Sequence, residues 1–380
     1  MKPILILFIT FGLLSCKNKT SQKQDKIYGK ALKLNHAQGF SVEDFGTYKI
    51  LEIKDPWPKS EKTYRYALLQ NNAKNDFPKT TAESFDGILN IPINRIVVTS
   101  TTHVANLDLL NQTQTLVGFP QTDFISSKKA RTLIENGNVR ELGKNESINT
   151  EVILELKPDV VIGFGIDGNT KVFETIKKSG IPVIFNGDWV EHSPLAKAEW
   201  IKFFGVLFNK ETQSDSIFDI IEKNYSEAKI LAKQATERPT VLSGAMHGDI
   251  WFLPNGKSTE AQLLHDANTR YLWQDTKGSG SLSLSFETVY TKAKNADIWL
   301  NPSIYNSMES LKAGNLQHAA FNAFKTNRIY TFTNTTGTTG GVTYFEEGFS
   351  RPDLALKDLI KICHPQLLPN YNLYFYKHLN

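Results

Sequence analysis

Short apolar runs alternate with helical stretches along most of the chain, and this pattern predicts the fold. The first set of apolar runs lies at 95–99, 115–118, 159–163 and 181–185. A second set lies at 240–245, 249–253, 297–300 and 328–332. Strands that alternate with helices form parallel sheets covered by helices on both faces. The sequence therefore predicts an α/β protein with two Rossmann-like lobes, each built on a mainly parallel sheet.

A long helical stretch separates the two sets of strands. In residues 211–234 the apolar positions, among them Ile217 and Ile221, keep one face at a period of 3.6. At 1.5 Å per residue such a helix reaches about 35 Å, which is enough to pass from one lobe to another. We therefore predict a first lobe at 91–208, a single rigid inter-lobe helix at 209–236 and a second lobe at 237–380.

Two further segments precede the first lobe. Apolar residues alternate loosely over 40–53, and 64–69 is another run rich in strand-forming residues. These patterns predict a small antiparallel β extension at 27–90. Residues 17–26 are polar throughout, which is typical of a flexible tether.

The first sixteen residues indicate export. Lys2 precedes an apolar run at 4–14, which is shorter than the about 20 residues of a spanning helix and suits an export signal. The run ends in Leu-Leu-Ser-Cys16, which resembles the lipobox of bacterial lipoproteins. We predict a signal peptide at 1–15, a lipid on Cys16 and a tether at 16–26, with the lipid as the protein's membrane attachment on the periplasmic side of the cell envelope. The alternative is a plain signal peptide with an incidental cysteine.

Composition narrows the function class. With 40% hydrophobic and 22% charged residues, the chain is neither a disordered protein nor a multi-span membrane protein. The net charge of +4 is spread without basic blocks, so we expect no nucleic-acid partner. Two cysteines exclude a disulfide scaffold and a cysteine-rich zinc module. We expect a monomer.

The two halves repeat one local pattern. Asn149-Thr150-Glu151 opens a helix that leads into the apolar run ending at 162, and Ser285-Phe286-Glu287 opens one that leads into the run ending at 300. Each has a capping residue, a glutamate two places later and a short helix before a buried strand. The repeat predicts that the two lobes are alike.

Together these features resemble the substrate-binding proteins of ABC importers. The resemblance is narrower to the members that carry siderophore-bound iron, haem or cobalamin, in which one rigid helix joins the lobes. It covers residues 93–362. Residues 95–103 resemble the family's first strand and turn, 154–162 its most recognisable stretch, and 296–299 the counterpart in the second lobe.

The resemblance implies a binding protein and not an enzyme. It would capture one metal chelate in the inter-lobe cleft and deliver it to a permease dimer with its ATPase. We favour a ferric siderophore and leave haem and cobalamin open. The resemblance implies no cofactor and no metal bound directly by the protein, because the ligand brings its own metal. It also gives Glu151 and Glu287 the role of docking on the permease, whereas the helix macrodipole alone also favours a glutamate in a first turn.

Polar residues at predicted strand ends are candidates for the cleft, because open α/β sheets bind ligands there. Thr101 and His103 follow the first strand of the first lobe, and His247 follows a strand of the second. Each histidine could contact the ligand or a metal held in it, or could be a capping residue. Arg351 could pair with an anionic ligand or flank a helix.

Aromatic residues collect at the same edges and could line a cleft for a large planar or chelated molecule. The candidates are Phe119, Phe164, Trp189, Trp251, Tyr305 and Tyr344. Core packing is the alternative for some of them. Since Trp251 and Phe252 are adjacent on a strand, at most one of the two faces the cleft.

Two other functions stay open. Gly163, Gly165 and Gly168 form a GxGxxG motif, and Asp188 follows at the distance of about 20 residues expected of a dinucleotide site. This would favour an exported enzyme that binds a phosphate or cofactor, whereas the glycines could equally serve a sharp turn toward a cleft. No GxSxG, Walker A or HExxH motif accompanies it. A surface lipoprotein that binds a protein partner through 27–90 is the other alternative.

Overall fold

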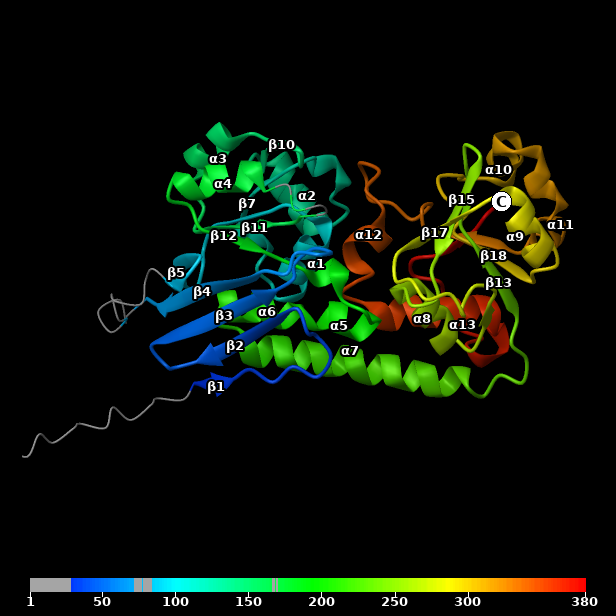
Figure 1. Ribbon diagram of the computed structural model, residues 1–380, viewed down its shortest axis with the longest axis horizontal. Coiled ribbons are helices and arrows are strands. Elements are labelled where there is room, and N and C mark those ends of the chain that lie inside the picture. Colours follow the sequence, from blue (N-terminus) through cyan, green and yellow to red (C-terminus); the bar gives the residue numbers. More distant parts are fainter. Residues whose placement is uncertain (1–28, 72–76, 78–83, 166–167, 169) are drawn as a thin grey trace, which may run out of the picture.

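The chain folds into two α/β lobes connected by one long helix, with an N-terminal sheet packed on the first lobe (Figure 1). The computed structural model describes residues 29–71, 77, 84–165, 168 and 170–380. The predicted signal peptide, Cys16 and the tether lie outside the described residues. Within the described ranges, no helix has both the length and the apolar character needed to cross a bilayer.

The first lobe is built on a parallel sheet with the strand order β12-β11-β6-β7-β8. The four longer strands are buried along their whole length, as expected when helices cover both faces. The strands are β6 (Ile96–Val98), β7 (Leu116–Phe119), β8 (Arg140–Glu141), β11 (Val160–Gly163) and β12 (Val183–Phe185), with a small ribbon of β9 (Gly143–Lys144) and β10 (Ser147–Ile148). The helices are α1 (Thr101–Leu109), α2 (Lys128–Glu135), α3 (Thr150–Leu156), α4 (Lys171–Lys178), α5 (Pro194–Glu199) and α6 (Ile201–Leu207).

The second lobe has a sheet of order β16-β13-β18-β19-β20, parallel except for the last strand, and a separate antiparallel sheet of order β14-β15-β17. Its strands are β13 (Thr240–Ser243), β14 (Ala245–His247), β15 (Ile250–Pro254), β16 (Arg270–Tyr271), β17 (Ser281–Leu284), β18 (Ile298–Leu300), β19 (Ile329–Thr331) and β20 (Lys377–His378). Its helices are α8 (Thr259–Asp266), α9 (Phe286–Ala293), α10 (Met308–Gly314), α11 (Asn322–Lys325), α12 (Thr343–Glu347) and α13 (Pro352–Cys363).

The two lobes share one strand order, which confirms the repeat seen in the sequence. The order β7-β6-β11-β12 in the first lobe matches β16-β13-β18-β19 in the second, and all these pairs are parallel. An aspartate joins the matching strands in each lobe. Asp159 accepts the backbone N–H of Arg95 at 2.9 Å, and Asp297 accepts that of Thr240 at 2.7 Å.

The inter-lobe helix α7 (Glu211–Ala232) belongs to both hydrophobic cores. Its 22 residues extend about 33 Å. Phe218 and Ile221 pack into the core of the first lobe, whereas Tyr225 and Ala228 pack into the core of the second. Moving these side chains out of either core would expose apolar surface to water, which is unfavourable. The helix therefore fixes the spacing of the lobes.

The N-terminal extension is a five-stranded sheet of β1 (Lys30–Ala31), β2 (Phe40–Asp44), β3 (Tyr48–Lys54), β4 (Thr63–Gln70) and β5 (Gly87–Ile91). The first three pairings are antiparallel as predicted, but β5 joins β4 in parallel. A parallel pair needs a connection of about a dozen residues or more, and 71–86 supplies it. The extension also shares the first lobe's core, where the Phe40 and Trp200 rings lie 4.7 Å apart.

A buried carboxylate fastens the extension to the first lobe. Glu199, at the end of α5, has no exposed surface and accepts the backbone N–H groups of His36 at 2.7 Å and Ala37 at 2.8 Å. The Nζ atom of Lys202, one turn later, lies 3.1 Å from the same carboxylate. Charge-assisted hydrogen bonds of this kind are roughly twice as strong as neutral ones.

We predict that Glu199→Ala destabilises the protein by about 3 kcal/mol, because it leaves buried backbone N–H groups without an acceptor and removes one of the two carboxylates that pair with the buried Lys202 ammonium. The free energy of unfolding in urea measures the effect. Glu227→Ala, on the exposed side of α7, is the matched control and should change stability by less than about 0.5 kcal/mol. Equal, small effects of both substitutions would contradict the role of Glu199.

Candidate functional site

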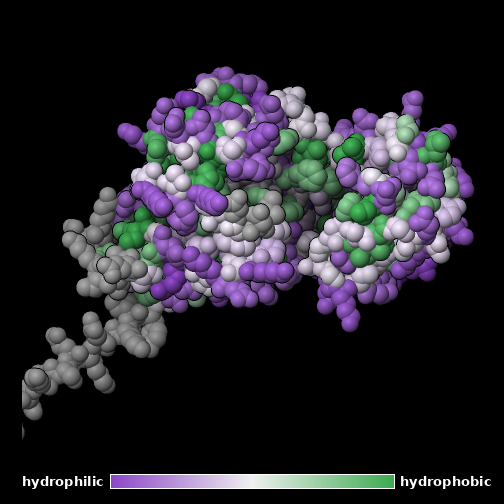
Figure 2. All heavy atoms as spheres, turned by 45° about the horizontal axis from the view of Figure 1, so that its top comes forward, coloured by the Kyte–Doolittle hydropathy of each residue, from purple (hydrophilic) through white to green (hydrophobic). Residues whose placement is uncertain are grey.

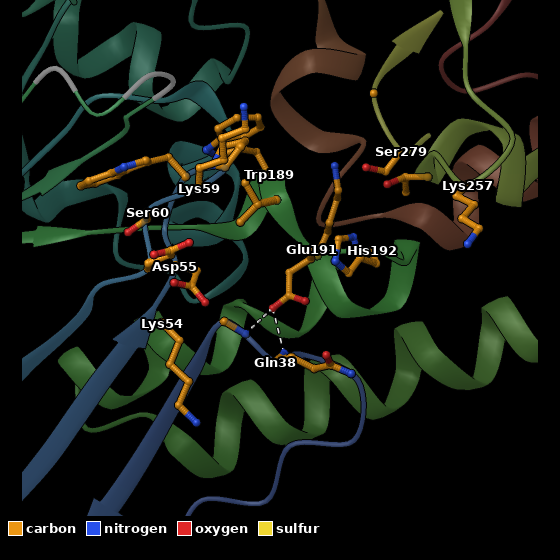
Figure 3. Close-up of a pocket in the computed structure, with 18 residues that line it drawn as sticks. Gln38, Lys54, Asp55, Lys59, Ser60, Trp189, Glu191, His192, Lys257 and Ser279 are labelled. Carbon is orange, nitrogen blue, oxygen red and sulfur yellow. Dashed lines mark hydrogen bonds between the residues drawn. The ribbon is translucent and has the colours of Figure 1, made fainter. Parts of the chain in front are cut away.

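A cavity of about 730 Å³ lies between the lobes and has three walls (Figure 3). Figure 2 shows a hollow between the two lobes. The extension, the first lobe and the second lobe each contribute one wall. The residues used below are Trp57 and Lys59 from the extension, Trp189 and Lys197 from the first lobe, and Lys257 and Ser279 from the second.

Trp57 holds the extension's loop at the cavity. It lies between two prolines, and its ring packs against Phe185 with the centroids 5.2 Å apart. A Cβ atom on Gly165 or on Gly168 would lie within 3.1 Å of the indole. Gly165 and Gly168 therefore make room for Trp57, and the first glycine of the motif, Gly163, makes room for the Phe173 and Phe185 rings. These contacts explain the glycines without a bound nucleotide.

The same loop carries backbone strain. Asp55, Lys59 and Glu61 all have positive φ angles, of 44°, 64° and 48°. Residues other than glycine adopt this left-handed region rarely, and such strain persists where the surrounding structure determines the conformation, often at ligand sites. The loop is thus a shaped wall of the cavity.

Asp188 organises the turn that follows β12. It is buried, accepts a hydrogen bond from the Thr102 hydroxyl at 3.0 Å, and its own N–H donates to Asn186 Oδ1 at 2.8 Å. Burial raises the pKa of Asp188 to about 6. Asp188 therefore serves the first lobe's interior and is not placed to contact the ribose of a dinucleotide.

The turn presents Trp189 to the cavity, as predicted. The Trp189 ring packs edge-on against Phe164, with centroids 5.9 Å apart. Phe164 thus supports the cavity wall through Trp189. Glu191, two residues further, accepts the backbone N–H groups of Gln38 at 2.9 Å and Gly39 at 2.8 Å (Figure 3). This carboxylate joins the extension to the first lobe at the edge of the cavity.

Lys197, on α5, is a buried cation in the cavity wall. Only 9% of the residue is exposed, and its ammonium lies 3.9 Å from the centroid of the Phe349 ring. Burial lowers the pKa of Lys197 to about 8, opposed by the charges of Asp188 and Glu191. The ammonium can attract an anion because its own neighbourhood is poorly solvated.

A second cavity, of about 380 Å³, opens in the second lobe and shares Ser279 with the first. Glu260 lies in its wall and accepts hydrogen bonds from the Ser243 hydroxyl at 2.8 Å and from Asn301 Nδ2 at 3.3 Å. Burial raises the pKa of Glu260. In the described ranges no three His, Cys, Asp or Glu side chains are grouped so that they could hold a metal ion.

His247 also lines the second cavity, at the exposed end of β14. Because only second-lobe residues line this cavity, the place of His247 at the inter-lobe cleft stays a prediction. On the neighbouring strand β15, Phe252 lines the same cavity whereas Trp251 does not. Trp251 is fully buried, donates from Nε1 to the Ser243 carbonyl at 3.0 Å and stacks on Trp299. The prediction for Trp251 is wrong because the alternation of the strand turns it into the core.

The prediction for His103 is also wrong. The residue lies in the first turn of α1, has no exposed surface and packs on Phe204, with ring centroids 5.7 Å apart. Burial lowers its pKa to about 3, so the ring is neutral. Phe119, at the end of β7, is 1% exposed and belongs to the same core, and its predicted place in the cleft is wrong as well.

Two polar candidates have structural partners. The Thr101 hydroxyl donates to the Phe345 carbonyl at 3.3 Å, which links α1 to α12 across the lobes. The Arg351 guanidinium forms a fork with both carboxylate oxygens of Asp353, each at 2.9 Å. Arg351 thus stands at the N-cap position of α13 with its guanidinium paired to Asp353, which agrees with the predicted helix-flanking role.

Two aromatic candidates support the second lobe's core. Tyr305 packs edge-on against His318 at 5.8 Å, and Tyr344 stacks on Phe332 at 4.2 Å between ring centroids. Both are packed against the core and are absent from the walls of the two cavities described above. Their place in the cleft therefore stays a prediction.

Glu151 and Glu287 occupy matching exposed positions in the two lobes. Each lies in the first turn of its helix, after a capping residue: the Asn149 side chain accepts the N–H of Val152, and the Ser285 hydroxyl accepts that of Thr288. In Figure 1, α3 and α9 both lie toward the upper part of their lobes, away from α7 along the lower edge. The two carboxylates are thus available at the surface.

The comparisons with known proteins identify the family. The family described as periplasmic binding protein matches residues 96–335, more than half of the chain. The chain belongs to this family. The matched region begins after the N-terminal extension and ends within the second lobe.

Relatives of this periplasmic binding protein include two uncharacterized lipoproteins of Methanocaldococcus jannaschii. One is 25% identical over 303 residues, covering 77% of this chain and 70% of its own length. The other is 26% identical over 327 residues, covering 82% of this chain and 80% of its own length.

Solved structures share the fold at low sequence identity. A periplasmic binding protein from Veillonella parvula superposes with a TM-score of 0.56 and 16% identity, covering 84% of this chain and 99% of its own. A possible iron-binding (periplasmic solute-binding) protein from Staphylococcus epidermidis gives 0.55 and 18%, covering 72% and 99%. A periplasmic haem-binding protein from Pseudomonas aeruginosa gives 0.55 and 16%, covering 72% and 93%.

We predict a pH-dependent effect of Asp188→Asn on the free energy of unfolding. The folded protein holds the proton of Asp188 more tightly than the unfolded chain does, because its pKa is about 6 against an ordinary 3.8. Stability from this group is therefore greatest below pH 4 and falls as pH rises to about 6. Relative to wild type, the variant should gain about 3 kcal/mol between pH 4 and pH 7. Urea unfolding curves at several pH values test this, and a difference that does not change with pH would contradict it.

Proposed function

We propose that this protein is the lipid-anchored substrate-binding component of an ABC importer, and that it captures a metal chelate in the inter-lobe cleft. The observation that carries the proposal is the cavity of about 730 Å³ with walls from both lobes. Its volume lies within the roughly 300–1,000 Å³ of small-molecule sites. Trp57 and Trp189 supply the aromatic faces that a large planar or chelated ligand requires.

The cleft is largely pre-formed in this account. Besides α7, hydrogen bonds connect the lobes. The Glu346 carboxylate, on α12, accepts the backbone N–H groups of Ser126 at 2.6 Å and Ser127 at 2.9 Å. Nearby, the Thr339 hydroxyl donates to the Asp123 carbonyl at 2.8 Å. The loop that follows β19 is thus docked on the first lobe, and we expect only small lobe movement on binding.

The names of two structural neighbours support part of the proposal on the ligand. The S. epidermidis protein is named as a possible iron-binding protein and the P. aeruginosa protein as a haem-binding protein. These names support a metal chelate as the ligand here. We favour a ferric siderophore, with haem and cobalamin as the other candidates, and the metal enters with the ligand.

The lipid anchor is part of the proposal. Cys16 follows the apolar export segment, and two relatives are named lipoproteins. A lipid at Cys16 would hold the binding protein at the membrane, on the periplasmic side, near its permease.

We predict that Trp57→Ala and Trp189→Ala each weaken ligand binding about tenfold, since each substitution removes about 1–2 kcal/mol of aromatic contact. Isothermal titration with ferric siderophores, haemin and cyanocobalamin measures the affinity. Ile220→Ala, on the exposed side of α7, is the control and should leave binding unchanged. Unchanged binding in both tryptophan variants would place the ligand outside the cleft.

For delivery, we propose that Glu151 and Glu287 dock the loaded protein on the two permease subunits. Exposed carboxylates at matching places in two lobes suit a two-fold partner that offers arginine side chains. Because the two helices begin with their own capping residues, the glutamates are free for a partner.

We predict that the double variant Glu151→Lys, Glu287→Lys abolishes transport into cells or proteoliposomes while ligand affinity stays at the wild-type value. Reversed charges would repel the arginine side chains without touching the cleft. The double variant Glu135→Lys, Glu309→Lys changes exposed glutamates on other helices of the two lobes, α2 and α10. It is the control and should transport normally. Normal transport by the first variant would refute the docking role.

A further inference from the structure

Lys197 is placed in the cleft by the start of α5. Ser193 caps this helix by accepting the N–H of Ala196, and Pro194 occupies its first position. The lysine follows one turn later and lies against the Phe349 ring, with its remaining exposure in the wall of the large cavity. Its ammonium thus lies where a ligand enters.

Lys197 differs from the other buried lysines that the structure describes. Lys49 pairs with Glu211, and Lys202 pairs with Glu199 and Asp215. Lys197 forms no hydrogen bond or ion pair with any described residue. Among the described residues, its ammonium makes one such contact, the cation–π interaction with the Phe349 ring. A buried ammonium without an anionic partner is unfavourable unless another molecule supplies the anion.

The carboxylates nearest to Lys197 are already engaged. Asp188 accepts the Thr102 hydroxyl, and Glu191 accepts two backbone N–H groups of the extension and the Trp200 indole. Both act on Lys197 only at a distance longer than an ion pair.

Charged groups on the helices packed against α5 are engaged as well. These helices are α6, α7, α8 and α13. Asp215 of α7 pairs with Lys202 of α6, Glu260 of α8 accepts the Ser243 hydroxyl, and Asp353 of α13 pairs with Arg351. The other charged or titratable side chains that line the cavity are exposed to solvent: Lys54, Asp55, Lys59 and Glu61 of the extension, His192 of the first lobe and Lys257 of the second.

A second donor on the same wall lacks an acceptor. The Nε1 atom of Trp189 is buried and forms no hydrogen bond with the described residues. The indole N–H donates only, as does the ammonium, so the first-lobe wall is rich in donors. A ligand that complements this wall offers acceptor oxygens, preferably charged.

We propose that Lys197 is the residue that recognises the ligand's charge, and that the ligand is therefore an anionic, carboxylate-bearing metal chelate. This inference rests on the proposed function and narrows it. The carboxylate of the ligand would take the place that Glu211 or Glu199 takes beside the other two lysines. Neutral chelates would leave the ammonium unpaired.

The proposal has a pH signature. The ligand carboxylate binds the protonated amine, whose pKa without ligand is about 8. Affinity should therefore be nearly constant up to about pH 7 and fall about tenfold by pH 9, as the ammonium loses its proton. Carboxylates on the ligand stay ionised over this range, so the fall reports Lys197.

The test uses the full chain in detergent and four probes: ferric citrate and haemin, which carry carboxylates, and ferrichrome and cyanocobalamin, which carry none. Isothermal titration is run at pH 7 and pH 9 on wild type, Lys197→Met and Lys197→Arg. We expect wild type to bind one of the two anionic probes in preference to the neutral ones. Lys197→Met should bind it at least about tenfold more weakly, and with no change between pH 7 and pH 9, whereas Lys197→Arg should retain binding at both.

Lys257→Met is the matched control, because it removes an exposed lysine from the same cavity, and it should keep both the affinity and the pH dependence. Thermal unfolding checks that Lys197→Met is folded, and we expect it to be at least as stable as wild type. If it does not fold, the wild-type pH profile decides, since affinity that is equal at pH 7 and pH 9 overturns the proposal.

The outcomes distinguish failure of the proposed role of Lys197 from failure of the proposed binding function. Binding of ferrichrome or cyanocobalamin that Lys197→Met leaves unchanged would overturn the role of Lys197 while the proposed function stands. Binding of none of the four probes by wild type would count against both. If the wild-type protein binds ferric citrate or haemin in preference to the other, that preference shows which kind of chelate carries the carboxylate that Lys197 recognises.

Discussion

The helix α7 is the constraint on which the rest of the structure depends. Its N-terminal half packs in the core of the first lobe and its C-terminal half in the core of the second. A hinge would have to break the helix or withdraw buried side chains from a core, and both are costly. The lobes therefore keep their spacing, and the cleft between them has a nearly fixed width. Affinity must come from the chemistry of the walls and not from closure around the ligand.

The N-terminal extension changes that chemistry. A two-lobe protein offers two walls, but here the loop around Trp57 supplies a third. Glu199 and Glu191 attach the extension to the first lobe through buried carboxylates that accept backbone N–H groups. Both carboxylates accept hydrogen bonds from the extension, and neither forms an ion pair with Lys197. The attachment of the extension and the unpaired cation in the cleft are thus two consequences of one arrangement.

Much of the fold could be predicted from the sequence, because buried parallel strands and a 3.6-residue period leave clear patterns. The apolar runs at 159–163 and 297–300 correspond to β11 and β18, and the matched helices before them confirm the repeat. The walls of the cleft could not be predicted in the same way. His103 lies in a helix whose buried face includes Thr102 and Asn106, so no apolar period marked it as a core residue. Lys197 is buried by Phe349, a contact between distant parts of the chain that no local pattern records.

The central claim is that one chelate binds in the cleft between the lobes, and native mass spectrometry tests it most directly. The full chain and a Ser279→Trp variant, whose added side chain would fill the space shared by the two cavities, are each mixed with ferric citrate, haemin, ferrichrome and cyanocobalamin. The account predicts one chelate per wild-type chain and none on the variant. Equal occupancy of both proteins, or no chelate on either, would contradict it.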